Sequence, residues 1–129
     1  AAVMANFFDS IEVAPGVHAN GEFTLGENIA DHGGLQVSYQ AFKKATAAAP
    51  LKIENGFTPE QRFFLSYANV WAGNIRPEEI LKRTKTDPHS LGKWRVDGAL
   101  PQIGAWYEAF NITEKDPMYL PVDKRVSIW

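Results

Sequence analysis

The chain has 129 residues, of which 45% are hydrophobic and 22% are charged, and its formal net charge is -2. These values are typical of a globular domain with a core of its own, so they exclude a wholly disordered chain and argue against nucleic-acid binding. No apolar run approaches the roughly 20 residues that cross a bilayer. The absence of cysteine excludes disulfides and thiolate ligands but leaves the compartment open.

The first part of the chain divides into an irregular lead-in and a long helix. Residues 1–23 are expected to be irregular, because proline, glycine and asparagine interrupt any apolar period. A helix is expected from Thr24 to Pro50, since Thr24 and Glu27 have the spacing of a capping box. The pair Gly33-Gly34 costs about 1 kcal/mol per residue inside a helix, which predicts either close approach by another backbone or a kink.

A second helix has the clearest start signal in the sequence. Thr58 is a suitable N-cap, Pro59 suits the first helical position, and Gln61 completes a capping box. The following residues, 63–71, are apolar on most sides, which predicts a buried helix. Gly73 is a candidate for the residue that ends it.

The remaining elements are expected to be short. A helix should run from Pro77 to about Thr84, residues 94–96 should be extended, and another helix should span Pro101 to Phe110. The sequence therefore predicts a single unit, residues 1–129, with a helical body over 24–129. Its fold class is mainly α, with three or four helices, irregular loops and little sheet.

Residue spacing alone reveals no complete catalytic apparatus. The histidines do not form the His-Glu-x-x-His pattern that holds zinc on one helical face, and no serine or cysteine nucleophile signature occurs. Glu27 and Asp31 are four residues apart, so they share a helix face. Their simplest interpretation is a capping residue and a dipole-stabilising carboxylate. The alternative is a zinc ligand beside a carboxylate that supports a histidine ligand.

Other candidate residues also have simple structural interpretations. His89 lies in an expected loop, where Asp87 is placed to hydrogen-bond its ring. Arg95 is by default a surface arginine, and Val70 with Trp71 is equally natural as helix core.

Several ordered blocks resemble the neprilysin family of zinc metalloendopeptidases. The signature is Gly26-Glu27-Asn28-Ile29-Ala30-Asp31 followed by Gly33-Gly34-Leu35, and the resemblance covers about residues 20–129. The further blocks, in the family's order and with similar spacing, are residues 61–68, 70–73, 76–78, 86–90 and 95–98. One short match could arise by chance, whereas several in the same order are hard to explain otherwise.

The resemblance assigns roles to these residues. It implies that Glu27 is the third protein ligand of a catalytic zinc and that Asp31 holds a zinc-bound histidine by a hydrogen bond. His89 would donate to the developing oxyanion, and Asp87 would orient its ring. By the same resemblance, Arg95 would bind a substrate carbonyl. Val70 and Trp71 would line an apolar pocket for the residue after the scissile bond.

The implied reaction is attack of a zinc-activated water on a peptide carbonyl, on the N-terminal side of a hydrophobic residue. The two histidine ligands and the glutamate base do not occur in this sequence. We therefore expect a C-terminal part of a longer peptidase that is inactive alone. Its partners would be a peptide substrate, the missing N-terminal part of the same protein, and a second copy if the exposed apolar face self-associates. The alternative function is a non-catalytic helical binding module derived from the same fold.

Two departures from the family pattern bear on origin and on one histidine. Vertebrate relatives have cysteines where this chain has Ala72 and, near its end, Val126-Ser127, which indicates a bacterial member. An extracytoplasmic location is expected, with a cytoplasmic one left open. His32 stands where asparagine is usual, and its direction on the helix predicts a structural role.

Overall fold

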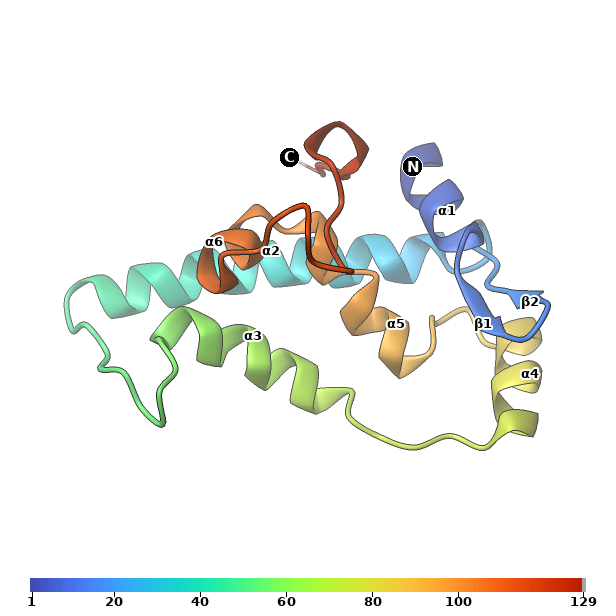
Figure 1. The fold of residues 1–129 in the computed structure, drawn as a ribbon, viewed down its shortest axis with the longest axis horizontal. Helices are drawn as coiled ribbons and strands as arrows, with labels where there is room; N and C mark the ends of the chain where they lie inside the picture. Colours follow the sequence, from blue (N-terminus) through green and yellow to red (C-terminus); the bar gives the residue numbers. More distant parts are fainter. Residues whose placement is uncertain (129) are drawn as a thin grey trace.

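The long helix α2 (Leu25–Ala47) runs along the length of the molecule and organises the fold (Figure 1). The computed structural model describes residues 1–128. Helix α3 (Pro59–Val70) runs beside α2 and is in contact with α6 (Gly104–Phe110). The expected long helix is thus confirmed, and it continues through Gly33 and Gly34 without a break.

The N-terminal residues are ordered, so the expected irregular lead-in is wrong. Helix α1 (Ala2–Asp9) is followed by a two-stranded antiparallel hairpin of β1 (Glu12–Ala14) and β2 (Val17–His18). The helix buries Met4 and Phe8, which are one turn apart. Gly21 lies against its backbone, since a Cβ at that position would meet the carbonyl oxygen of Ala5.

The C-terminal half is built from short helices. They are α4 (Pro77–Thr86), α5 (Gly92–Asp97), the 3-10 turn η1 (Leu100–Gln102), α6, and the 3-10 turn η2 (Val122–Lys124). The expected extended segment at 94–96 is therefore wrong, because these residues lie inside α5. The expected helix over 101–110 is divided where Ile103 adopts an extended backbone between η1 and α6.

Two apolar clusters hold these elements together. The larger one joins α2, α3, η1 and α6 through Leu35, Phe64, Leu100, Ile103 and Trp106, among others. The smaller one packs α1 against the start of α2 through Met4, Phe8 and Ile11. The described chain contains six α-helices and one short hairpin, so the expectation of a mainly helical fold with little sheet is confirmed.

Helix capping differs between the two longest helices. At α3 the side chain of Thr58 accepts from the backbone of Gln61 and the side chain of Gln61 accepts from the backbone of Thr58, as predicted. At α2 no such box forms, because the Thr24 hydroxyl donates to the carbonyl of Asn20 instead. The Glu27 side chain is consequently not used as a cap. Gly73 does not end α3, whose C-cap is Trp71.

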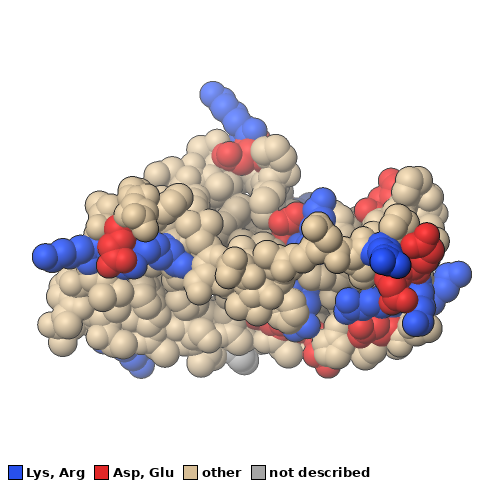
Figure 2. Space-filling model, turned by 90° about the horizontal axis from the view of Figure 1, so that it is seen from below, with Lys and Arg blue, Asp and Glu red and all other residues tan. Residues whose placement is uncertain are grey.

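Helix α3 is buried on one face only, which corrects the expectation of burial on most sides. Phe64 is its one fully buried side chain, whereas Leu65 and Val70 are exposed. In the view from below, acidic and basic side chains mix at the end of the molecule that carries α4, while the central area is largely free of charge (Figure 2). Over residues 1–128, no helix has the length and apolarity that a membrane crossing requires.

Candidate functional site

The first turn of α2 brings Glu27 next to His89. The imidazole Nε2 of His89 lies 3.3 Å from Oε2 of Glu27, and both side chains are about two-fifths exposed, at 42% and 43%. His89 belongs to the loop between α4 and α5, far from Glu27 in the sequence. The structure thus brings together two residues that the sequence singled out separately.

Asp87 fixes the other side of the His89 ring. Its Oδ1 accepts from the backbone N–H of His89 at 2.9 Å and lies 2.8 Å from Nδ1 of the ring. Its Oδ2 accepts from Nε of Arg83 at 3.0 Å. The backbone N–H of His89, then its ring and then Arg83 stabilise the carboxylate and lower the pKa of Asp87 to about 2. Asp87 therefore contacts both the backbone and the ring of His89, and its orienting role in catalysis stays a prediction.

One turn further along α2, Asp31 forms a bidentate pair with Arg95. The guanidinium donates from Nε to Oδ2 at 2.7 Å and from a terminal nitrogen to Oδ1 at 2.6 Å. The hydrogen bond to Asp31 is the largest cause that raises the pKa of Arg95, and the negative charges of Asp31 and Glu27 raise it further. The sequence did not predict this pair, because nothing local links residues separated by 64 positions.

Aromatic side chains at the end of α3 and just after it support Arg95. Its guanidinium carbon lies 3.8 Å from the centre of the Trp71 ring, so the cation stacks on the indole face. The hydroxyl of Tyr67 donates to the backbone carbonyl of Arg95 at 2.7 Å. Burial raises the pKa of Tyr67 to about 12, with a further contribution from the negative charge of Asp31.

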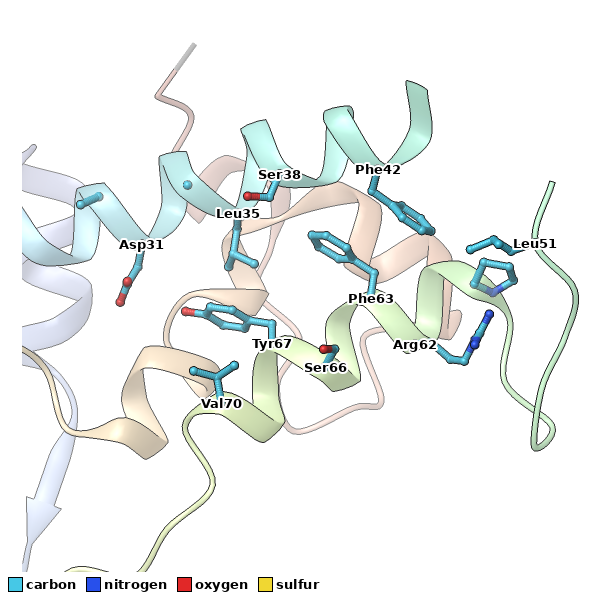
Figure 3. Close-up of a pocket in the computed structure, with 13 residues that line it drawn as sticks. Asp31, Leu35, Ser38, Phe42, Leu51, Arg62, Phe63, Ser66, Tyr67 and Val70 are labelled. Carbon is cyan, nitrogen blue, oxygen red and sulfur yellow. The ribbon is translucent and has the colours of Figure 1, made fainter. Parts of the chain in front are cut away.

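An apolar groove of about 540 Å³ opens beside Asp31, between α2 and α3 (Figure 3). Leu35 and Tyr67 point toward each other across it, and Val70 lies at the end near Asp31. Val70 is 69% exposed, so it is not the core residue that the sequence also allowed. Phe42, Leu51 and Phe63 line the opposite end of the groove.

A buried polar chain lies directly behind the exposed Glu27–His89 pair. Ser90 donates to Oδ1 of Asn28 at 2.7 Å, and the amide of Asn28 donates to the Thr24 hydroxyl at 3.0 Å. All three side chains are buried. Sequence reasoning missed this chain, although two of its members immediately follow Glu27 and His89, which was the available signal.

The chain does not contain a complete metal site. No three histidine, aspartate or glutamate side chains within residues 1–128 are grouped so that they could hold a metal ion. A catalytic zinc takes three protein ligands and keeps an open position. Glu27 fits the role of one such ligand, because its half-exposed carboxylate is not used in capping and faces His89.

Comparison with known proteins agrees with this geometry. The family model "Peptidase family M13" matches residues 1–126. Human neprilysin is 38% identical over 123 residues, and mouse membrane metallo-endopeptidase-like 1 is 41% identical over 123 residues. Bovine endothelin-converting enzyme 1 is 40% identical over 106 residues. These alignments cover 93%, 93% and 80% of this chain.

Solved structures show the same likeness in three dimensions. The zinc metalloprotease Zmp1 of Mycobacterium tuberculosis, in complex with an inhibitor, superposes with a TM-score of 0.93 and 31% sequence identity. That match covers 99% of this chain and 20% of the Zmp1 chain. The fold and the sequence therefore both match part of a known zinc metalloprotease.

The chain belongs to peptidase family M13. The resemblance to the neprilysin family is thereby confirmed, as is the expected fold class. The chain spans 14% to 16% of the length of the curated relatives named above.

Proposed function

We propose that this chain is the C-terminal part of a zinc-dependent endopeptidase that cleaves on the N-terminal side of hydrophobic residues. The observation that carries the proposal is the convergence of Glu27, His89 and Asp87 at the start of α2, beside the Asp31–Arg95 pair. Such an arrangement joins a candidate metal ligand, a hydrogen-bond donor for an oxyanion and a cation for a substrate carbonyl. Zinc is inferred from the family, and when bound it would polarise the substrate carbonyl and activate a water.

The residues of this chain divide the work by their geometry. With Nδ1 of His89 held by Asp87, Nε2 faces the space beside Glu27, where an N–H on it would donate to a developing oxyanion. Arg95 uses two of its five N–H groups on Asp31, so the others can bind a substrate carbonyl. Each carboxylate oxygen of Asp31 retains acceptor capacity for a histidine contributed from outside the chain.

The first experiment uses the longer protein that carries this chain. Glu27→Gln should remove most of the bound zinc, measured by atomic absorption, together with peptidase activity. Glu78→Gln, on the exposed surface of α4, is the matched control and should leave both unchanged. Full zinc content and activity in Glu27→Gln would show that Glu27 is not a zinc ligand. A longer protein that neither binds zinc nor cleaves peptides would support the binding-module alternative.

Specificity is tested with matched peptides that differ in the residue after the scissile bond. The exposed Val70 and the neighbouring Trp71 offer apolar surface beside Arg95. A peptide with leucine or phenylalanine there should be cleaved faster than one with aspartate. Equal rates would contradict the specificity while leaving the peptidase proposal intact.

We also propose that the α2–α3 groove receives the N-terminal part of the same protein. Beside Leu35 and Phe42, α2 lines the groove with a row of small residues at one-turn intervals, Ala30, Gly34 and Ser38, along which another backbone can approach closely. A Cβ added at Gly34 would meet nothing within 4 Å. The relatives' length outside the matched segment is ample to supply such a partner.

Complementation between separately produced parts tests this docking. Leu51→Asp, which places a charge at the groove, should weaken binding of the N-terminal part, whereas Val122→Asp should not. Val122 is a fair control because it is 71% exposed and lies in η2, outside the groove. Sedimentation of the chain alone reports the other occupant, a second copy, whose binding would be lost in the same Leu51→Asp variant.

The isolated 129-residue chain should hydrolyse no peptide even with added zinc, since one expected ligand cannot hold a catalytic metal. Turnover by the purified chain, with the Glu27→Gln variant as its control, would contradict this. The absence of cysteine at Ala72 and near the C-terminus supports a bacterial origin.

A further inference from the structure

The hydrogen bonds among Thr24, Asn28 and Ser90, next to the Glu27–His89 pair, have defined donors and acceptors. Thr24 donates its hydroxyl to the carbonyl of Asn20 at 2.9 Å, so its oxygen accepts the amide of Asn28. The side-chain oxygen of Asn28, Oδ1, then accepts from the Ser90 hydroxyl at 2.7 Å. Asn28 is 3% exposed and Ser90 is 7% exposed. Water therefore cannot readily replace these bonds, and each donor has a single assigned acceptor.

This series of hydrogen bonds links the two elements that carry the candidate site. Asn28 follows Glu27 on the first turn of α2, and Ser90 follows His89 in the loop before α5. The other polar links of that loop are more exposed, since the His89 side chain is 42% exposed and that of Arg83 is 39% exposed. Leu91 in the same loop is 8% exposed, but apolar burial is not directional. Within the loop, the buried Ser90–Asn28 bond is both directional and shielded, and the bidentate Asp31–Arg95 pair adds a second directional link between α2 and α5.

We propose that Ser90 and Asn28 are positioning residues that hold the His89 imidazole in line with the Glu27 carboxylate. They touch neither substrate nor metal, and they act through the residues that precede them in the chain. The kinetic consequence rests on the proposed peptidase function, whereas the geometric one does not. A displacement of about 1 Å at a catalytic group can reduce a rate by about a hundredfold.

The geometric test uses the 129-residue chain at one fixed pH. A nuclear Overhauser effect between the His89 ring protons and the Glu27 methylene protons reports the proximity of the two side chains. Ser90→Ala and Asn28→Ala should each weaken this signal at least about twofold, and the double variant should be no worse than either single one. Ser90→Thr keeps the hydroxyl and should restore it. Tyr107→Phe is the matched control, because it removes another buried hydroxyl-to-carbonyl bond, 2.8 Å to Pro101, away from the site.

The kinetic test uses the longer protein. Ser90→Ala should lower kcat by about tenfold to a hundredfold with little change in KM, and Ser90→Thr should recover it. Tyr107→Phe should keep kcat. If the longer protein cleaves no peptide, the peptidase proposal fails, while the Overhauser measurement still decides the positioning proposal.

Each result decides for or against the positioning role. An unchanged Overhauser signal in folded Ser90→Ala and Asn28→Ala overturns it, as does the same loss in Tyr107→Phe. Should Ser90→Ala fail to fold, Ser90→Cys provides a weaker donor of similar size, for which an intermediate loss supports the proposal and no loss overturns it.

Discussion

The two ends of α2 differ in what completes them. At the N-terminal end, Glu27 and Asp31 are paired with His89 and Arg95 of the same chain. At the C-terminal end and in the loop that follows, Leu51 is 49% exposed and Ile53 is 67% exposed. The comparison shows that this chain pairs its own polar groups at one end of α2, whereas apolar side chains stay exposed at the other end. The fold can therefore hold candidate catalytic groups in place before any metal or partner is added.

The largest expected effect comes from the buried side of α3. Phe64 is 1% exposed and stacks on Tyr39 with ring centres 5.3 Å apart. Phe64→Ala should cost about 3 to 5 kcal/mol of unfolding free energy, because it leaves a cavity in the larger cluster. Urea unfolding measures the loss.

The neighbouring Leu65 provides the matched control. It is 41% exposed on the open face of the same helix, so Leu65→Ala should cost only about 0.5 kcal/mol or less. Equal losses at the two positions would show that both faces of α3 are covered in solution, for example by a second copy.

The next effect tests the polar end. Arg95→Ala leaves the Asp31 carboxylate, which is only 13% exposed, without its bidentate partner, and should cost about 2 to 3 kcal/mol. Arg95→Lys should recover only part of this, since an ammonium cannot supply two parallel donors to both oxygens. Thermal unfolding of the three proteins gives the ranking.

An exposed ion pair on α4 is the control, because breaking it should cost little stability. Lys82 and Glu79 lie 3.4 Å apart on α4, with side chains 68% and 49% exposed. Lys82→Ala should change stability by less than about 0.5 kcal/mol. A loss at Arg95 no larger than this would mean that Asp31 is fully solvated once unpaired.

Local signals predicted the parts of the fold that depend on local chemistry. Thr58, Pro59 and Gln61 fix the start of α3 through a cap that uses only neighbouring residues, and the sequence identified it. The six-residue helix α5 was missed because it is too short to show a period. Helix α1 was missed although Met4, Phe8 and Ile11 recur at helical spacing, because the following turn residues dominated the interpretation.

The site follows the same division. Glu27 and Asp31 share a face by helical spacing alone, and Asp87 reaches His89 two residues away. Pairs that cross the fold, such as Asp31 with Arg95 and Asn28 with Ser90, depend on how separate elements pack. No periodicity encodes such contacts, so they required the structure.

A smaller effect concerns Asp87, at the polar end, and the loss of stability at low pH. The pKa of Asp87 is lowered to about 2, chiefly by the N–H and ring of His89. The unfolded chain therefore takes up a proton first, and this contribution to stability is present above about pH 4 and is lost as pH falls toward 2. Asp87→Asn should cost roughly 1 kcal/mol at pH 7 and make acid unfolding shallower in that window. Asp123→Asn, in the exposed turn η2, should change neither value.

The smallest effect concerns Tyr67, which lies where the polar end meets the groove. Burial raises its pKa to about 12, so between pH 10 and 12 the unfolded tyrosine releases a proton that the folded one keeps. This contribution to stability is complete below pH 10 and is lost as pH rises toward 12. Tyr67→Phe should cost about 1 kcal/mol at neutral pH, through the lost bond to the Arg95 carbonyl, and should flatten the alkaline decline. Urea unfolding at neutral and several alkaline pH values measures the stability loss and the alkaline decline. An equally steep decline in the variant would show that Tyr67 is solvated in the folded protein.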